Sequence, residues 1–297
     1  MVQKQTKGLI LTIAGAVSWG ACGVISEFLF KRGFNPDMMS VLRMLLAGST
    51  FLVLAYFFPR KHSKSIVQLF THKKNLIELM LFAFFGILIC QYGYFLSIAY
   101  SNAGIATMIC YIGPALVMLT TCVLARKLPK RNEVIALFLA LLGIFLLATK
   151  GDFESLKING YALFWGIASA VGMIFYTLTP RRIVMYFGST RIMGFALLIA
   201  GVLLGIKVQI WALEIPTDGI FWLCLLIIIA VGTMGATWMF INGMIVIGAV
   251  KASMIACLEP LCAALFSFAF LGAHFIFVDI IAFVCIVSTV FLMNRIR

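Results

Sequence analysis

Long apolar runs separated by short polar connections dominate this sequence. Ten such runs lie at about residues 8–30, 38–58, 77–100, 104–125, 133–149, 160–180, 190–207, 220–247, 252–271 and 275–294. A helix needs about 20 apolar residues to cross roughly 30 Å of hydrocarbon. The chain is 63% hydrophobic and 11% charged, against about 45–50% and 25% in soluble domains. The sequence therefore predicts an all-α integral membrane protein with ten transmembrane helices.

The distribution of basic residues predicts how such a chain lies in the membrane. The formal net charge is +13, with 23 Lys and Arg residues. If the N-terminus is cytoplasmic, most of them fall at the termini or in inner loops, including Lys7, Lys73, Arg126 and Arg182. The outer loops carry few, namely Lys31, Arg32, Lys150, Lys157 and Lys207. This bias predicts that both termini are cytoplasmic, and it explains the basic balance without a nucleic-acid partner.

The eight cysteines all fall inside the predicted spans, and no CxxC pair occurs. Cysteines in such positions are typical of small apolar packing residues. The sequence therefore predicts no disulfide, no metal site and no cofactor.

The chain repeats itself at one fixed offset of 146 residues. Trp19-Gly20 then falls on Trp165-Gly166, and Pro114 falls on Pro260. The repeat divides the chain into two five-helix halves, residues 1–149 and 150–297. Because five is odd, the second half must enter the membrane from the opposite side. Such inverted repeats are typical of secondary transporters, whose substrate site lies near the midplane between the repeats.

These features resemble the EamA subgroup of the drug/metabolite transporter superfamily. The resemblance rests on the "WG" in the first helix of each half, on the proline in the fourth, and on the tail "GPALVMLTTCVLARKLPKRNEVIALFLALLGIFLLA". It covers nearly the whole chain. It implies a bacterial inner-membrane protein that exports small molecules, with a cavity lined by the first, third and fourth helices of each half.

The stretch "IACLEPLC" places Glu259 directly before Pro260 in an apolar run. Proline lacks an N–H group and crowds the carbonyl four residues back, so Pro260 leaves the carbonyl of Ala256 in need of another partner. Pro114 has the same effect on Cys110. Both prolines are therefore predicted hinges. A mid-membrane carboxylate costs about 2.5–3.5 kcal/mol on insertion scales. Glu259 is thus either a cavity group that binds a cation or a proton, or a paired or protonated structural residue.

Deep polar and aromatic residues complete the candidate substrate site. Tyr and Trp far from the interfaces need partners for their polar atoms, and a hydrated pocket supplies them. For each residue singly, helix packing is the alternative. Glu27 is expected to pair with Lys31, and Arg43 is expected to extend outward to the interface. The candidates besides Glu259 are Trp19, Gln91, Tyr92, Tyr94, Tyr111, Trp165, Tyr176, Trp238 and Asn242.

The function indicated is secondary transport, as an exporter, of a small organic metabolite such as an amino acid or organic cation by alternating access. The partners are then the substrate and the lipid bilayer, with proton or ion coupling as an open possibility. A flippase for a lipid or polyprenyl carrier shares the architecture and stays as the alternative. An embedded enzyme is disfavoured, since the sequence has no HExxH, GxSxG or Walker A motif. A monomer and a homodimer both remain open.

Overall fold

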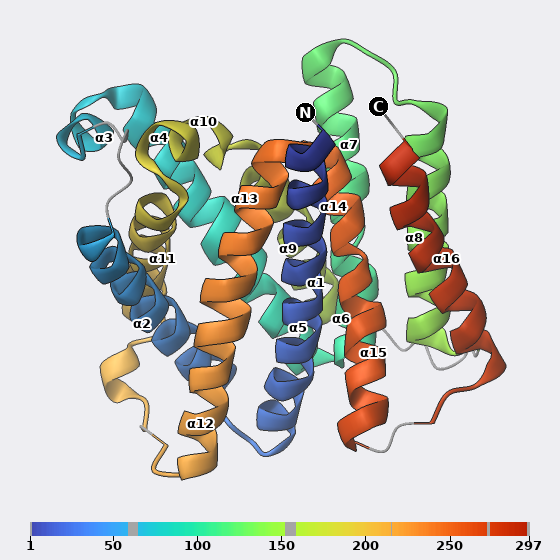
Figure 1. Ribbon diagram of the computed structural model, residues 1–297. Coiled ribbons are helices and arrows are strands. Elements are labelled where there is room, and N and C mark those ends of the chain that lie inside the picture. Colours follow the sequence, from blue (N-terminus) through green and yellow to red (C-terminus); the bar gives the residue numbers. More distant parts are fainter. Residues whose placement is uncertain (1, 59–64, 152–158, 215, 272–273, 296–297) are drawn as a thin grey trace.

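The computed structural model describes residues 2–58, 65–151, 159–214, 216–271 and 274–295, which form a bundle of helices with no strand (Figure 1). Lys157, one of the outer-loop residues in the charge analysis, lies outside the described residues. The first half of the chain contains α1 (Val2–Lys31), α2 (Pro36–Phe57), α3 (Val67–Thr71), α4 (Lys73–Leu81), the π-helical segment η1 (Phe82–Tyr92), α5 (Gly93–Tyr100), α6 (Ala103–Cys110), α7 (Gly113–Ala125) and α8 (Arg131–Thr149).

The second half follows the same order. It contains α9 (Gly160–Leu178), α10 (Pro180–Phe187), α11 (Ser189–Lys207), the short turn η2 (Ile210–Ala212), α12 (Gly219–Ile227), the π-helical segment η3 (Ile228–Ala236), α13 (Thr237–Ile247), α14 (Ala249–Ala256), α15 (Leu258–Leu271) and α16 (Phe277–Arg295). The two π-helical segments begin at Phe82 and Ile228, which are equivalent positions of the repeat.

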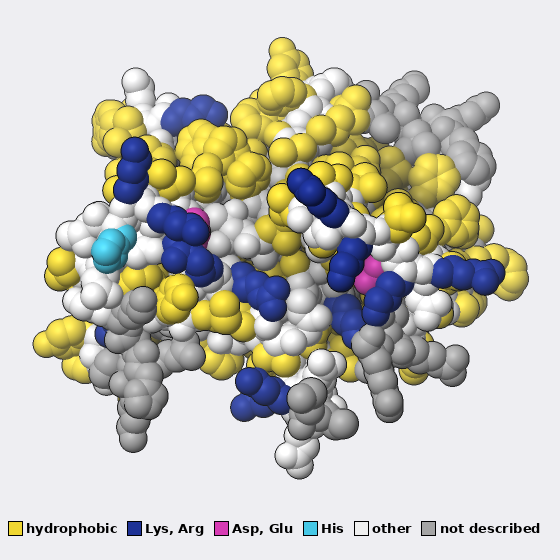
Figure 2. Space-filling view, turned by 90° about the horizontal axis from the view of Figure 1, so that it is seen from above, with side chains coloured by type: hydrophobic (Ala, Val, Ile, Leu, Met, Phe, Trp, Pro, Cys, Tyr) yellow, Lys and Arg dark blue, Asp and Glu magenta, His cyan; other side chains and the backbone are white. Residues whose placement is uncertain are grey.

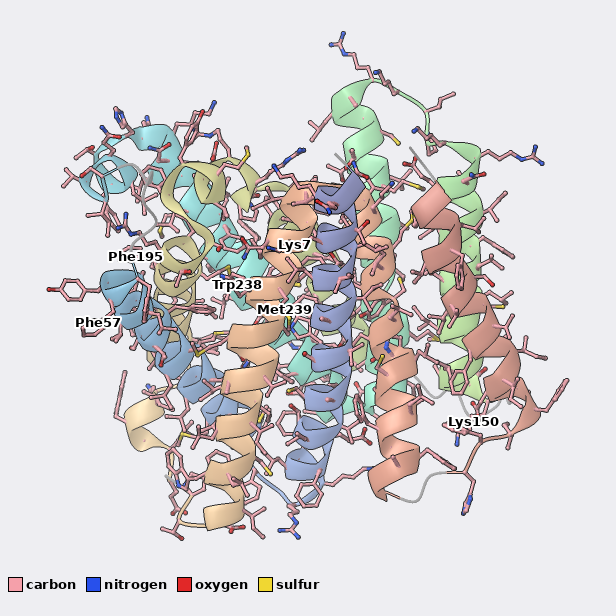
Figure 3. The ribbon with its side chains drawn as sticks, viewed as in Figure 1. Lys7, Phe57, Lys150, Phe195, Trp238 and Met239 are labelled. Atoms are coloured by element: carbon pink, nitrogen blue, oxygen red, sulfur yellow. The ribbon has the colours of Figure 1, made fainter. Side chains whose placement is uncertain are left out.

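Nine helices in the described part of the chain are long and apolar enough to cross a membrane. They correspond to the first nine predicted spans. The apolar helix Phe277–Met293 in α16 is shorter, so the tenth span stays a prediction. Large apolar side chains cover the outside of the bundle. Figure 3 shows Phe57 pointing away from it, and this ring is 67% exposed. An apolar exterior of this kind suits a lipid environment.

Four helices begin at an Asn or Asp side chain that caps the first turn. Asn35, Asn102, Asn159 and Asp218 each accept a hydrogen bond from a backbone N–H two or three residues ahead. Such caps satisfy N–H groups that a helix leaves unpaired at its start. The sequence thereby sets where α2, α6, α9 and α12 begin.

The two halves interlock instead of standing side by side. α1 packs against η3, α13 and α15 of the second half, and its repeat equivalent α9 packs against η1, α5 and α7 of the first. α2 pairs with α11, and α8 pairs with α16. α1 and α9 run in opposite directions (Figure 1). The first helix of each half is therefore wrapped by the third and fourth helical units of the other.

The repeated glycines permit this close wrapping. A Cβ atom on Gly20 would lie 2.6 Å from the carbonyl oxygen of Glu259, and one on Gly166 would lie 2.6 Å from the Cγ2 atom of Ile109. Small residues at such crossings allow backbones to approach closely. The "WG" pairs of the sequence thus mark the contacts of α1 with α15 and of α9 with α6.

The bundle has two polar ends, which we call the terminal face and the opposite face. Figure 3 places Lys7 toward the first and Lys150 at the second. Figure 2 looks onto the terminal face, where Lys and Arg side chains are spread widely and Asp and Glu are few. α4 begins, α7 ends and α10 lies at this end of the bundle (Figure 1), and Lys73, Arg126 and Arg181 in or next to these elements are exposed. The terminal face is therefore basic, as the sequence predicts, and the orientation that this implies stays a prediction.

Candidate functional site

A cavity of about 140 Å³ lies at the centre of the bundle, between the two halves. Six of the predicted site residues line it, namely Trp19, Gln91, Tyr94, Tyr111, Tyr176 and Glu259. The remaining lining residues are Cys22, Gly23, Ser26, Arg43, Cys90, Phe95, Cys110, Ser169, Met173, Ile228, Gly232, Thr233, Phe240 and Ala256. The wall is thus mostly apolar and aromatic, with one carboxyl and one guanidinium group. Whether these residues bind a substrate stays a prediction.

Glu259 reaches the cavity because the helix carrying Pro260 is interrupted. α14 ends at Ala256 and α15 begins at Leu258, so the break lies where the proline removes a backbone hydrogen bond. The hydroxyl of Tyr111 donates to the carbonyl oxygen of Ala256 at 2.8 Å. This is the replacement partner that the sequence required. In the first half, α6 ends at Cys110, four residues before Pro114.

The same Tyr111 hydroxyl also lies 2.6 Å from Oε2 of Glu259. A phenol has one proton, so it cannot fully satisfy two acceptors at once. If Glu259 is ionised, Ala256 and the carboxylate share that proton. If Glu259 is protonated, its O–H can donate to the phenol oxygen while Tyr111 donates to Ala256. Glu259 is therefore held by a group that accommodates both of its protonation states.

Arg43 of α2 points inward, and the expectation that it extends to the interface is wrong. The residue is only 6% exposed and lines the cavity. Its Nη1 lies 3.4 Å from Oγ1 of Thr233, and its guanidinium carbon lies 4.7 Å from the ring centre of Phe95. The physical reason is the helix face: Arg43 precedes buried Ala47 by four residues, so the two share the side of α2 that packs on the bundle.

Four aromatic rings cluster at the end of the cavity nearest the terminal face, and three of them, Trp19, Tyr176 and Phe240, line it. Trp19 lies 4.9 Å from Phe240 and 6.2 Å from Tyr176 between ring centres. Tyr176 lies 5.8 Å from Phe240 and 5.9 Å from Phe82. These rings come from α1, α9, α13 and η1. On α1 and α9 the rings of Trp19 and Tyr176 are nearer the terminal face than the other lining residues of those helices, so the cluster lies at the end of the cavity toward that face.

A second cavity of about 200 Å³ adjoins the first on the other side. Gly23, Tyr94 and Glu259 line both cavities. From there it extends between α1, α8, α15 and α16 to Lys150 and His274 near the opposite face, with Pro260 in its wall. Glu259 thus lies in the wall shared by the central cavity and the second cavity, which reaches toward the opposite face.

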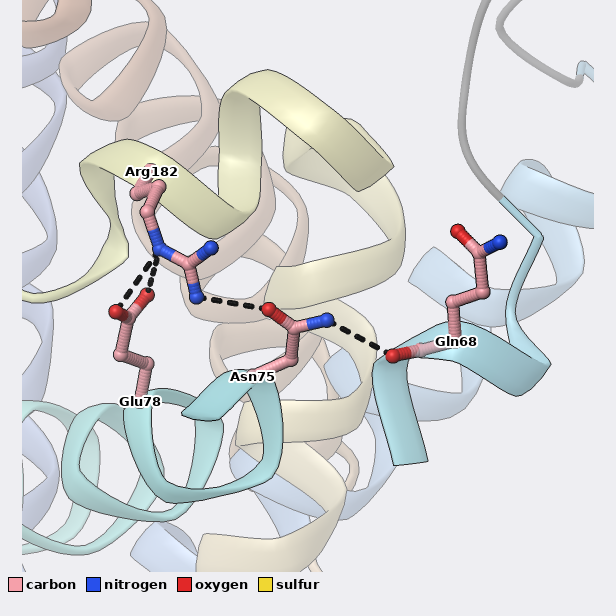
Figure 4. A network of polar contacts seen from close by, with 4 residues as sticks. All are labelled: Gln68, Asn75, Glu78 and Arg182. Atoms are coloured by element: carbon pink, nitrogen blue, oxygen red, sulfur yellow. Dashed lines mark hydrogen bonds and ion pairs between the residues drawn. The ribbon is translucent and has the colours of Figure 1, made fainter. Parts of the chain in front are cut away.

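A polar cluster joins the two halves at the terminal face (Figure 4). Nε of Arg182 on α10 lies 2.9 Å from both carboxylate oxygens of Glu78 on α4, and its Nη2 donates to Asn75 at 2.7 Å. Asn75 in turn donates to the carbonyl of Gln68 at 2.8 Å. This cluster ties the second half to the first at the same end of the bundle as the aromatic rings.

The other predicted site residues lie away from the central cavity. Tyr92 donates to Asp37 at 2.7 Å, and Nζ of Lys207 lies 5.3 Å from the ring centres of both Tyr92 and Trp165. This group packs α2, η1, α9 and α11 together. Near the opposite face, Glu27 pairs with Lys31 at 2.8 Å, as the spacing predicts.

Trp238 and Asn242 lie on α13. Trp238 is 40% exposed on the bundle exterior, and Asn242 donates to the Trp238 carbonyl and to Ser189 of α11. Packing explains these contacts, as it does for Pro114, which is buried in α7 outside the cavity wall.

Sequence reasoning missed several lining residues besides Arg43, among them Cys22, Ser26, Ser169 and Thr233. A signal for two of them was available. Cys22 and Ser26 follow Trp19 at spacings of three and seven, so all three occupy one face of α1. Ser169 stands four residues after Trp165 on α9 and lines the cavity, but Trp165 itself does not. Helical spacing from Trp165 was therefore no reliable guide to the lining face of α9.

The fold and the cavity define a membrane protein built from two interlocked copies of one helical unit around a central chamber, the architecture of a secondary transporter. The comparisons with known proteins agree. The chain belongs to the EamA-like transporter family, whose model matches residues 6–149 and again residues 160–295.

A Salmonella typhimurium protein named "Uncharacterized inner membrane transporter YicL" is 30% identical over 292 residues, which cover 97% of this chain and 95% of that protein. One solved crystal structure has a TM-score of 0.71, covering 94% of this chain and 95% of the other. At 16% identity, that similarity shows a shared fold.

Proposed function

We propose that this membrane transporter is a secondary exporter of a small organic metabolite and works by alternating access. The two halves, residues 1–149 and 150–297, are the units that move against one another, and the central cavity between them is the substrate site. The breaks before Pro114 and Pro260 are the positions at which the halves bend. Export is the direction that the family resemblance implies.

The observation that carries this proposal is the asymmetric closure of the central cavity. Four aromatic rings cluster at its end toward the terminal face, where the Arg182–Glu78 pair also joins the two halves, and we take this end as the closed one. A second cavity leads from Glu259 toward the opposite face. A chamber between two repeats with one closed and one accessible side is the arrangement that alternating access requires.

The proposed setting is a bacterial inner membrane with both termini in the cytoplasm. The basic terminal face supports this orientation through the positive-inside rule, and the Salmonella relative is named as an inner membrane protein. In this orientation the described conformation faces outward.

The character of the cavity supports a small amphipathic substrate. Its volume of about 140 Å³ is below the range of about 300–1,000 Å³ typical of pockets for drug-sized ligands. This size favours a metabolite over a lipid or polyprenyl carrier. Aromatic walls suit an apolar group, and the Glu259 carboxyl suits an ammonium group or a proton. An amino acid or an organic cation meets these requirements.

Flux measurements in proteoliposomes test the proposal, using metabolites first selected because they raise the melting temperature of the purified protein. Glu259→Gln removes the charge at constant shape, and Glu214→Gln is the matched control at an exposed position outside both cavities. Loss of a charged hydrogen bond, worth about 1.5–3 kcal/mol, predicts a roughly 10- to 100-fold weaker apparent affinity for an amine substrate in Glu259→Gln alone.

The same variants test ion coupling. If Glu259 carries the proton, the pH dependence of wild-type flux disappears in Glu259→Gln, and an unchanged pH dependence would exclude that role. Absence of flux for every stabilising metabolite, together with chemical turnover of one of them in detergent, would overturn the transport proposal itself.

A further inference from the structure

We propose that Arg43 is the anion subsite of the central cavity and that the transported molecule carries a carboxylate, which Arg43 binds. This inference rests on the proposed function, because it assigns a substrate class to the same cavity. Glu259 alone is compatible with an amino acid and with a purely cationic solute. An anion subsite at Arg43 would favour substrates that carry a carboxylate, including amino acids, over purely cationic ones.

The first observation is that Arg43 is a buried cation without an anionic partner. The residue is only 6% exposed, and no carboxylate within the described part of the chain forms an ion pair with it. Arg182 provides the contrast, since Glu78 and Asn75 satisfy its guanidinium group. An unpaired charge at membrane depth is costly and usually marks a functional group.

The second observation is that one edge of the Arg43 guanidinium group, formed by Nε and Nη2, has no hydrogen-bond partner among the described residues. Nη1 contacts Thr233, whereas Nε and Nη2 are buried and have no hydrogen-bond partner among the described residues. Nε and Nη2 form one edge of the planar group, with two roughly parallel N–H bonds. That edge binds a carboxylate through two hydrogen bonds, and the match of geometry is the reason arginine is favoured at such sites.

The third observation is that the guanidinium is held in place before any ligand arrives. Its face packs on the ring of Phe95, with 4.7 Å between the guanidinium carbon and the ring centre. Thr233 fixes Nη1 from the other half of the chain at 3.4 Å. Both residues line the cavity with Arg43. A group fixed in this way loses little conformational freedom on binding, which favours affinity.

Glu259 does not neutralise Arg43, because its carboxyl group contacts Tyr111 on another part of the wall. The cavity therefore presents a cationic and an acidic group at separate positions, in a wall that also carries aromatic rings. A molecule with a carboxylate at one end, and either a donor or an amine at the other, complements both groups.

The experiment compares acids with their primary amides, which keep the shape and lose the charge. The probes are benzoate, phenylalanine and leucine, each with its amide, titrated against the purified full chain while the melting temperature is followed. The variants are Arg43→Gln, Arg43→Met in case the amide side chain prevents folding, and Arg43→Lys as the conservative replacement. Arg181→Gln, at an exposed position outside the cavity, is the matched control.

We expect at least one acid to stabilise the wild type where its amide does not. Arg43→Gln should need about 10-fold more acid or greater for half-maximal stabilisation, because a charged hydrogen bond is lost. Arg43→Lys should recover part of that loss, and Arg181→Gln should match the wild type.

Three results would overturn the inference: amides as effective as acids, an unchanged acid response in both Arg43→Gln and Arg43→Met, or no acid of the panel raising the melting temperature. Flux separates this failure from failure of the proposed function. If wild type and Arg43→Gln export a solute without an anionic group equally well, the anion subsite is wrong and transport stands.

Discussion

Replacing Tyr111 by Phe tests how the break at Pro260 is stabilised. The substitution removes one oxygen atom and leaves the ring in place. That oxygen lies 2.8 Å from the Ala256 carbonyl and 2.6 Å from Glu259. Leaving a buried acceptor unsatisfied costs about 1–3 kcal/mol, and losing a hydrogen bond to a charged group costs about 1.5–3 kcal/mol. Because one proton serves both acceptors, the costs do not add fully, and we expect about 2–4 kcal/mol.

The measurement is the melting temperature of the purified protein in detergent. In domains of 150–250 residues, 1 kcal/mol corresponds to about 2–4 °C. At the low end, suited to a chain of 297 residues, Tyr111→Phe should melt about 4–8 °C below the wild type. Tyr161→Phe is the control, since Tyr161 is 67% exposed and also packs by its ring. A Tyr111→Phe protein that melts within about 1 °C of the wild type would refute the role assigned to this hydroxyl.

Two further experiments test the packing of the halves, one at a glycine contact and one at an ion pair. Gly20→Ala places a Cβ atom 2.6 Å from the Glu259 carbonyl oxygen, and we expect a loss of about 1–3 kcal/mol from overpacking. Gly160→Ala, where a Cβ meets nothing within 4 Å, should melt like the wild type, so equal melting of both variants would contradict the close approach. Glu78→Gln and Arg182→Gln should each destabilise the described conformation by about 1 kcal/mol. The double variant should be no worse than either single one, and additive losses in a double-mutant cycle would show that the pair does not interact.

Much of the fold follows from the sequence, because hydrophobic runs and the internal repeat can be read without knowing the tertiary packing. The lengths of the apolar runs predict the helices, and the alignment of Trp19-Gly20 with Trp165-Gly166 predicts that the chain contains two copies of one helical unit. The proline rule goes further. It predicts that the Ala256 carbonyl needs a partner, although it cannot say that Tyr111, 145 residues away in the chain, supplies it.

What could not be predicted depends on tertiary packing. The π-helical segments η1 and η3 need a neighbour that stabilises their wider turns, and no local pattern marks them. Arg43 was misjudged because its position near the start of α2 suggested access to the interface, whereas the packed face of the helix decided its direction. Packing also decided which aromatic candidates reach the cavity. Trp19 and Tyr176 line it, and Trp165 and Trp238 do not.

The central claim is that two copies of one helical unit lie in opposite orientations across the membrane. Its most direct test is labelling of single cysteines placed at Lys73 and at Lys150 with a maleimide that cannot cross the membrane, in intact and permeabilised cells. The protein with only its native cysteines gives the background labelling. Any native cysteine that reacts is replaced by serine or alanine. We predict that Lys150→Cys reacts in intact cells and that Lys73→Cys reacts only after permeabilisation. Reaction of both positions from the same side would contradict the account.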